Sequence, residues 1–347
     1  MVRIRFLGHI FLLLIGILPG NGIEASSRCG ERSAIKKNTN NTNSTPTLHA
    51  LSQDIQHLWD TRKNCVVKVM GLKEGSDPRN FLFGTGFFID NGGHILTTAT
   101  IVTEAKDLWV EYGGLSYAAT LVGKDTTTNL AIIKLVKCPA CFAAINLESH
   151  GDHFSAEGSL VIAIGCALGL EPAPILGLIT GKNITFGDRI FSITYLRSDI
   201  NICGGESGAP IFGSDGSLCG ILIASLPELR SSFILPGNAL GRICSDIIRE
   251  GQVVYATAGF SARGQITAHG DKEVIISAID GQKIHYSGAE TLQIGDKIDK
   301  IDGQKINQEG DIADILFFKR PHEVMNLDIL RWKEVLKVAI ILEKKAS

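Results

Sequence analysis

The segment at residues 205–210, Gly-Glu-Ser-Gly-Ala-Pro, is the part of the sequence best suited to chemistry. Ser207 lies in a glycine-rich stretch, where a tight turn can expose its hydroxyl group. The backbone N–H groups of Gly205 and Ser207 can then point at one shared anion. A serine hydroxyl is a weak nucleophile and needs a base, usually a histidine that a carboxylate orients. Because a short Gly-x-Ser-Gly segment is often an ordinary turn, the surrounding residues decide what Ser207 can do.

Three segments around this serine resemble the HtrA/Deg (Do-like) family of trypsin-like serine proteases. Residues 199–210 resemble the family's Asp-Ala-Ala-Ile-Asn-Pro-Gly-Asn-Ser-Gly-Gly-Pro, residues 84–90 its Gly-Ser-Gly-Phe-Ile-Ile-Asp, and residues 163–170 its Ala-Ile-Gly-Asn-Pro-Phe-Gly-Leu. The exit at residues 234–236 and the end of the next helix, residues 249–253, resemble its protease-to-PDZ linker. The resemblance covers roughly residues 60–343. It implies a mainly β protein: a trypsin-like double β-barrel followed by a small α/β PDZ domain.

The resemblance also shows where the catalytic partners should be. The family's histidine, in Leu-Thr-Asn-Asn-His-Val-Val, falls on Thr100, and its aspartate, in Thr-Asp-Leu-Ala-Val-Leu-Lys, falls on Asn129. A threonine cannot act as a base near neutral pH, and asparagine has no charge to stabilise an imidazolium. Glu206 replaces an asparagine beside the serine and adds negative charge near the expected oxyanion hole. Ser207 is therefore either a vestigial nucleophile or only a turn residue.

Another histidine could replace the missing base. His94 begins the strand that leads to Thr100, but its side chain is poorly placed to reach Ser207. His150 and His153 lie in a polar stretch that is best explained as a solvated loop. An active serine endopeptidase with a displaced base such as His94 therefore stays as the alternative.

The N-terminus has the pattern of an export signal. Arg3 and Arg5 precede an apolar run of 13 residues, 6–18, and a small-residue stretch follows at 25–27. A membrane anchor needs roughly 20 apolar residues, so cleavage is favoured over retention as an anchor, and no later segment is expected to span a membrane. We expect a signal peptide at 1–25 and, because residues 36–47 are rich in Asn and Thr, a flexible leader at 26–50. The protein would then be exported to a bacterial periplasm or cell envelope.

The rest of the chain divides into a β-rich part, a helix and an α/β part. Short β-rich runs separated by turn residues predict a double-barrel domain at 51–236. Apolar residues on one face at 238–250 predict a helix, assigned as a linker at 237–251. We expect residues 252–347 to form a PDZ domain, with strands at 274–279, 327–330 and 336–342 and a helix at 312–318.

The cysteines allow disulfides or thiol chemistry. The chain has eight cysteines, and export would permit disulfides, although sequence does not give their pairing. Cys138 and Cys141 have redox spacing, but they follow a predicted strand rather than beginning a helix, so a local disulfide or two unreactive thiols is favoured. A thiol-redox protein is a further alternative. Cys203, four residues before Ser207, could also be disulfide-bonded. No ligand spacing indicates a metal, and we expect no cofactor.

The C-terminal part has a candidate peptide site. Residues 289–304 resemble the PDZ run Ala-Gly-Leu-Lys-Pro-Gly-Asp-Val-Ile and the Ile-Asp-Gly-Lys that follows. PDZ domains bind extended C-termini by strand addition. The family's Gly-Tyr-Leu-Gly carboxylate loop is expected at Gly259, Phe260, Ser261 and Ala262, where alanine in place of the last glycine alters the loop.

Together these features favour an exported, catalytically inactive HtrA-like protein that binds peptides or unfolded proteins. The resemblance implies a homo-oligomer, a trimer. Balanced charge, with 34 basic and 36 acidic residues, argues against nucleic acid as a partner. A purely structural scaffold is the remaining alternative.

Overall fold

The computed structural model describes residues 48–73, 81–147, 156–186, 189–226, 228, 230–267 and 270–345. The expected signal peptide at 1–25 and most of the expected leader at 26–50 lie outside the described residues, as do His150 and His153. The leader was placed slightly too far along the chain, because Leu48 already begins helix α1 (Leu48–Arg62).

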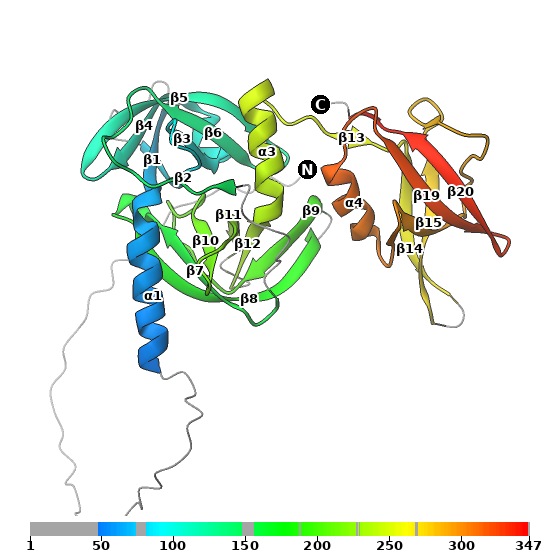
Figure 1. Ribbon diagram of the computed structural model, residues 1–347, viewed down its shortest axis with the longest axis horizontal. Helices are drawn as coiled ribbons and strands as arrows, with labels where there is room; N and C mark the ends of the chain where they lie inside the picture. Colours follow the sequence, from blue (N-terminus) through cyan, green and yellow to red (C-terminus); the bar gives the residue numbers. More distant parts are fainter. Residues whose placement is uncertain are drawn as a thin grey trace, which may run out of the picture. The chain divides into compact units, whose positions relative to one another are not determined.

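The first part of the chain forms a closed antiparallel barrel (Figure 1). After α1 and a short 3-10 turn η1 (Lys63–Cys65), its strands follow in the order β1-β2-β3-β6-β5-β4 around the barrel. Their bounds are β1 (Val66–Lys73), β2 (Phe81–Phe88), β3 (His94–Thr98), β4 (Ala105–Tyr112), β5 (Leu115–Asp125) and β6 (Leu130–Leu135). The one-turn helix α2 (Ala99–Val102) follows β3 directly. Alternate side chains such as Val67 and Val69 on β1 point inward and fill the barrel with aliphatic residues.

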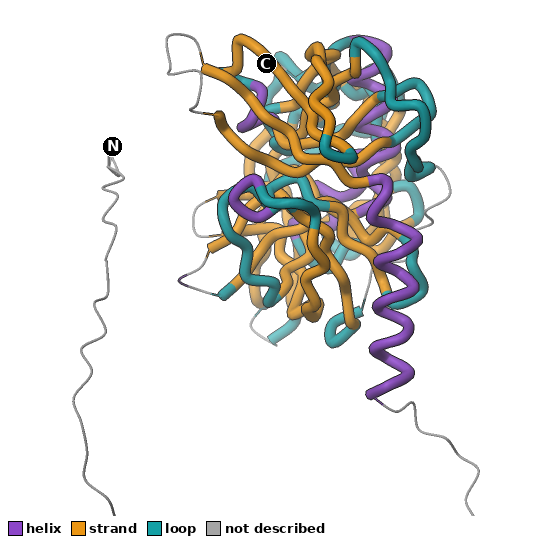
Figure 2. Tube along the Cα trace, turned by 90° about the vertical axis from the view of Figure 1, so that its left-hand side faces the viewer, coloured by secondary structure: helices purple, strands orange, loops and turns teal. Residues whose placement is uncertain are grey.

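A second closed antiparallel barrel follows, with strand order β10-β11-β12-β9-β8-β7. Its strands are β7 (Leu160–Gly165), β8 (Ala173–Phe186), β9 (Arg189–Ser198), β10 (Pro210–Gly213), β11 (Leu218–Leu226) and β12 (Ser231–Pro236), with a 3-10 turn η3 (Ala167–Gly169) after β7. Two barrels of six strands each are the expected double-barrel architecture. Figure 2 shows how far strands outnumber helices in the described chain.

Helix α3 (Gly237–Glu250) packs against both barrels. It contacts β5 and β6 of the first and β11 and β12 of the second. Leu240, Ile243 and Ile247 are completely buried on one face of the helix. The helix ends at Gly251, whose φ of 72° is the left-handed conformation that glycine adopts without strain. The helix predicted at 238–250 is therefore present, one residue longer.

The C-terminal part is a β-sheet with one helix. The sheet order is β14-β15-β17-β19-β20-β16, with β18 paired to β17, and a separate two-stranded pair joins β13 to β21. The elements are β13 (Ala256–Thr257), β14 (Phe260–Ile266), β15 (Lys272–Ile279), β16 (His285–Tyr286), β17 (Lys297–Ile301), β18 (Gln304–Lys305), α4 (Glu309–Phe318), β19 (Val324–Arg331), β20 (Glu334–Ile341) and β21 (Glu343–Lys344). This part has an aliphatic core of its own, built around Ile276, Ile298 and Leu327.

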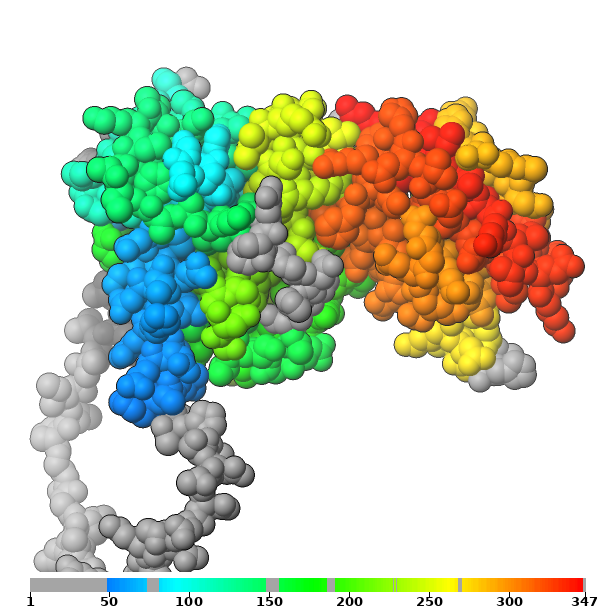
Figure 3. All heavy atoms as spheres, in the orientation of Figure 1, coloured from blue at the N-terminus to red at the C-terminus, as the bar shows by residue number. Residues whose placement is uncertain are grey.

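The largest differences from the sequence-based expectation are strands that were not predicted. Strand β12 was treated only as the exit from the barrel. Strand β14 contains Phe260, Ser261 and Ala262, which were expected to form a loop. Both are defined by backbone pairing to a neighbouring strand rather than by a clear alternation of apolar and polar residues. Helix α1 lies at the surface (Figure 3). Among the described helices, none has both the length and the apolar character needed to cross a membrane.

Candidate functional site

Ser207 lies in a tight turn between β9 and β10. Gly205 and Gly208 have φ angles of 97° and 91°, values that side-chain-bearing residues rarely adopt. The turn is also crowded, since a Cβ atom on Gly208 would lie 2.1 Å from the carbonyl oxygen of Thr85. The Ser207 hydroxyl donates to the carbonyl oxygen of Ile223 at 3.3 Å, so it is held by backbone rather than by a base.

Thr85 of β2 connects the serine turn to the first barrel. Its N–H donates to the carbonyl oxygen of Ser207 at 2.9 Å, and its hydroxyl donates to that of Gly205 at 2.8 Å. The same hydroxyl accepts the N–H of Cys166 at 2.9 Å, while the Thr85 carbonyl accepts the Thr97 hydroxyl at 2.7 Å. Thr85 is fully buried. The N–H and the hydroxyl of Thr85 therefore both help fix the turn that carries Ser207, and its carbonyl connects β2 to Thr97 of β3.

These hydrogen bonds hold the carbonyl groups of Gly205 and Ser207 so that they point toward Thr85. Among the hydrogen bonds of the described residues, the N–H groups of Gly205 and Ser207 donate to no protein acceptor. Two unpaired N–H groups in one turn can hold an anionic oxygen. Gly205 and Ser207 therefore keep two N–H groups that no described acceptor takes.

Thr100 and Asn129, which occupy the expected histidine and aspartate positions, are in direct contact. The Oδ1 atom of Asn129 accepts both the hydroxyl of Thr100, at 2.8 Å, and its N–H, at 3.0 Å. The Asn129 carbonyl accepts the N–H of Ala99 at 2.9 Å. The chain therefore brings together the two positions that the motif alignment identified, but joins them by a neutral hydrogen bond.

Asn129 has a positive φ of 59°, and the loop before it fixes this conformation. Asp125 Oδ2 accepts the N–H of Thr128 at 3.0 Å and its hydroxyl at 2.6 Å. The same oxygen accepts the phenol of Tyr255, at 2.6 Å, from the segment after α3. Asp125 and Tyr255 were not recognised from the sequence, because their contact joins residues 130 positions apart.

Glu206 turns away from solvent beside Ser207. Only 5% of its surface is exposed, and its carboxylate accepts the N–H of Cys203 at 2.5 Å. Burial raises the pKa of this carboxyl, and the hydrogen bond from Cys203 opposes the rise only in part. A negative charge so close to the Gly205 and Ser207 N–H groups would disfavour an anionic oxygen between them.

His94 is engaged elsewhere. Its Nδ1 lies 2.6 Å from the Asp90 carboxylate. Although burial raises the pKa of Asp90, hydrogen bonds from the His94 backbone and ring lower it below its usual value. His94 and Thr98 are the two ends of β3, which at the usual strand rise puts them about 13 Å apart. The Ser207 turn is attached near the Thr98 end, through Thr85 and Thr97.

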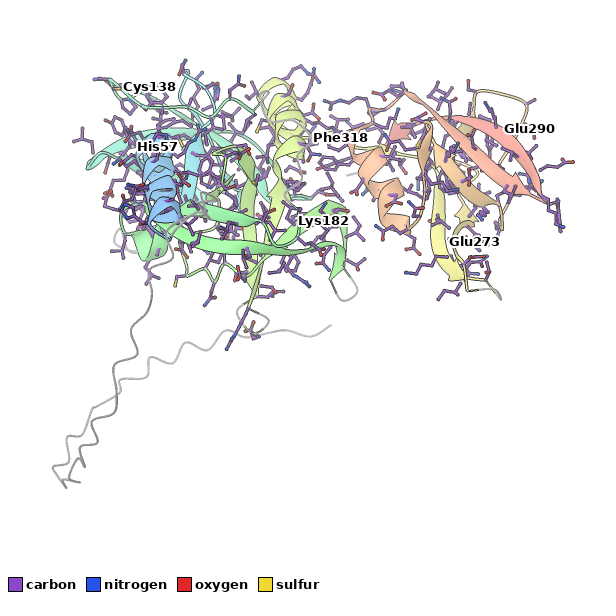
Figure 4. All side chains as sticks on the ribbon, turned by 60° about the horizontal axis from the view of Figure 1, so that its bottom comes forward. His57, Cys138, Lys182, Glu273, Glu290 and Phe318 are labelled. Carbon is purple, nitrogen blue, oxygen red and sulfur yellow. The ribbon has the colours of Figure 1, made fainter. Side chains whose placement is uncertain are left out.

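The seven described cysteines are free thiols in this structure, so the disulfide considered for Cys203 is not formed. Cys138 and Cys141 follow β6 and begin no helix, as expected; Figure 4 labels Cys138 on the first barrel. Burial raises the pKa of both Cys65 and Cys166 to about 12, so neither is a ready nucleophile.

The predicted peptide site is only partly a loop. Gly259 has a φ of 69° and packs tightly on the backbone of Lys283. Phe260, Ser261 and Ala262 instead belong to β14 and pair with β15 through a bulge. Of the four residues expected to form the loop, only Gly259 lies outside the strand, because backbone pairing with β15 already begins at Phe260.

Comparison with known proteins agrees with this architecture. Residues 84–221 match the family model described as "Trypsin-like peptidase domain". The chain is 24% identical over 273 residues to "Serine endoprotease DegS" of Haemophilus influenzae, covering 75% of this chain and 77% of that protein. It is 27% identical over 283 residues to a "Probable periplasmic serine endoprotease DegP-like" of Halomonas elongata, covering 78% of this chain and 58% of that protein. The chain thus spans little more than half the length of the DegP-like relative.

Solved structures show the same fold. "HtrA-type protease AlgW with tripeptide" superposes with a TM-score of 0.68 at 18% identity, covering 84% of this chain and 98% of that one. "Crystal structure of the serine endoprotease from Yersinia pestis" gives 0.61 at 20% identity, with 84% and 98% covered. The chain therefore has a trypsin-like fold, carries a trypsin-like peptidase domain over residues 84–221, and is similar in sequence to HtrA-type serine proteases.

Proposed function

We propose that this chain is a catalytically inactive HtrA-like protein of the bacterial cell envelope that binds peptides or unfolded segments as a chaperone, adaptor or regulator. The observation that carries the proposal is the contact between Thr100 and Asn129. Thr100 and Asn129 fall where the family has its base and the acid that orients it, and neither side chain can take up a proton near neutral pH.

The chemistry of the turn supports inactivity. A serine protease without its triad partners keeps only about 10³–10⁴-fold acceleration over water, from the oxyanion hole and binding alone. Here the Ser207 hydroxyl donates to a backbone carbonyl, and the buried Glu206 sits beside the hole. Both features lower the reactivity of Ser207 further.

The retained scaffold supports binding. The serine turn is rigidly held through Thr85, and two backbone donors remain available in it. In the C-terminal part, β14 is an edge strand, the type of element to which PDZ domains add a peptide. We infer that this part is a PDZ domain. The pattern of an export signal in the sequence and the word "periplasmic" in the names of relatives support an envelope location, and the family resemblance supports a homotrimer.

The second candidate is an active serine endopeptidase with a displaced base. Ser207 is kept, and the relatives are named endoproteases. His94 is the candidate base, but its ring is paired with Asp90. This pairing favours the inactive protein.

A fluorophosphonate probe and a casein-hydrolysis assay test the proposal together. We expect neither labelling of Ser207 nor cleavage by the purified wild type, under conditions where an active HtrA-type protease gives both. Casein cleavage that Ser207→Ala abolishes would contradict inactivity. If His94→Ala abolished the same cleavage without lowering thermal stability, the displaced-base alternative would be supported.

A further inference from the structure

Strand β14 has one open side. It is the last strand of the C-terminal sheet and pairs only with β15 among the described strands. In an antiparallel pair, alternate residues direct their N–H and C=O groups toward the partner and away from it. An edge strand therefore presents a row of backbone groups that another extended chain can pair with.

One of these backbone groups is already taken by a side chain. Glu309, the first residue of α4, accepts the N–H of Gly264 with its carboxylate. Since this N–H points away from β15, alternation places the backbone groups of Ala262 and Ile266 on the same open side. The carboxylate thus lies where the carbonyl oxygen of an added peptide strand would lie.

Glu309 is not needed to cap its own helix. Gln308 and Asp311 form a capping box at the start of α4. The carboxylate of Asp311 accepts the N–H of Asn307 at 2.7 Å and that of Gln308 at 3.1 Å. Glu309 itself is exposed to solvent. Its contact with Gly264 therefore joins helix and strand rather than completing the helix end.

The space beside this contact is a groove. Residues of β14, β15 and the start of α4, together with Ile184 of β8, line a cavity of about 370 Å³. Ile266 in this lining exposes 73% of its surface. Besides Glu309, two charged residues line it: Glu273, which is paired with Lys297 at 2.9 Å, and Lys272 at the start of β15. A ligand that took the N–H of Gly264 would displace the Glu309 carboxylate. This carboxylate, at the mouth of the groove, would then have no hydrogen-bond donor.

We propose that Glu309 is an internal latch on the β14 edge, and that the groove selects extended peptides carrying a lysine or arginine opposite the start of α4. The peptide main chain takes over the N–H of Gly264, and its basic side chain pairs with the released carboxylate. This inference rests on the proposed peptide binding of the C-terminal part. It makes Glu309 both a barrier to peptides in general and the residue that favours basic ones.

Hydrogen exchange of the Gly264 amide in the full chain tests the latch without any ligand. We expect Glu309→Ala to speed exchange at Gly264 about tenfold, the equivalent of losing one hydrogen bond of roughly 1.4 kcal/mol. Glu309→Gln keeps an acceptor oxygen and should retain part of the protection. Glu290→Ala removes an exposed carboxylate of the same part of the chain, well away from Glu273 of the groove (Figure 4), and should change nothing. Equal exchange in wild type and Glu309→Ala would overturn the proposal.

Fluorescence anisotropy with two labelled Val/Thr decapeptides, one with a central lysine and one with a central glutamate, tests the selection. The wild type should bind the lysine peptide at least tenfold more tightly, and Glu309→Gln should abolish the preference. Equal binding of both peptides by the wild type would refute basic selection. If neither peptide bound any variant while exchange at Gly264 still responded to Glu309→Ala, the latch contact would stand and the proposed peptide binding would fail.

Discussion

Asn129 keeps the hydrogen-bond acceptor that a catalytic aspartate uses to orient its partner, but it lacks the aspartate's negative charge. Its Oδ1 accepts two hydrogen bonds from Thr100, so the acceptor already points at the residue that would carry the imidazole. The backbone at Asn129 is held by its loop and by Ala99. Restoring the two side chains should therefore need no rearrangement of the backbone, which makes the proposed inactivity testable by reconstruction.

We expect Thr100→His combined with Asn129→Asp to restore reactivity at Ser207. A positioned general base contributes about 10²–10⁴-fold to such reactions, so fluorophosphonate labelling should accelerate within that range. The triple variant that also carries Ser207→Ala is the control and should stay unlabelled. No labelling in a double variant that keeps the wild-type melting temperature would mean that elements beyond the triad are defective.

Glu206 should make the protein less stable as the pH rises. Burial raises the pKa of its carboxyl above the usual value of 4.5, so the folded chain binds a proton more readily than the unfolded chain. Stability is then lost as the pH rises through the raised pKa. Glu206→Gln keeps an acceptor for the Cys203 N–H, and it should raise the melting temperature at pH 7 with much less effect at pH 4.

The exposed Glu290→Gln is the matched control for that comparison. It should leave the melting temperature nearly unchanged at both pH values. A gain from Glu206→Gln that is equal at pH 4 and pH 7 would show that the charge of Glu206 is not the cause.

At the scale of elements, Thr85 is the point where β2 holds the serine turn. Replacing it with valine keeps the shape but leaves the Gly205 carbonyl and the Cys166 N–H without their partner in a fully buried place. Unsatisfied buried groups cost about 1–3 kcal/mol each. We expect Thr85→Val to lower the free energy of unfolding in urea by about 2–4 kcal/mol.

Thr85→Ser distinguishes the contribution of the hydroxyl group to stability from that of the methyl group. It keeps every hydrogen bond and removes one methyl, worth about 1 kcal/mol. Thr85→Val should therefore be the more damaging of the two. The opposite order would mean that packing, and not hydrogen bonding, is what Thr85 contributes.

The sequence predicted best the elements whose buried apolar residues recur at the period of the element itself. Helix α3 differs from its predicted bounds by one residue, because its apolar residues recur at the helical period. Strand β14 was missed because its residues are mostly polar and exposed. Its existence depends on pairing with β15, which no local pattern records.

The candidate site divides in the same way. Motif alignment identified Ser207, Thr100 and Asn129, and the fold joins the last two directly. The motif alignment could not identify the roles of Thr85, Asp125 or Glu309. Each of them contacts a residue far away in the sequence, at separations of 120, 130 and 45 positions. Only folding reveals such contacts, because the residue type alone fits many structural roles.

At the scale of the whole molecule, several exposed apolar side chains lie close together on the barrels. Leu168 and Leu170 expose 71% and 65% of their surface. They flank Gly169, against which the ring of Phe83 packs, and Phe83 is itself 38% exposed. Apolar side chains that gather at one place on a surface usually mark a contact with another molecule. Together with the family resemblance, this patch favours self-association.

We expect light scattering coupled to size-exclusion chromatography to give the mass of three chains. In a ring of identical chains, every interface joins the same two surfaces, so a substitution in the sequence changes every interface of the ring. If the patch takes part, Leu168→Asp together with Leu170→Asp should shift the mass toward one chain, because each interface would then bury charges. As the control, Leu115→Asp on β5, a residue that is 62% exposed, should leave the mass unchanged. A wild-type mass of one chain at every concentration would contradict the trimer, and an unchanged trimer in the double variant would place its interface elsewhere on the barrels.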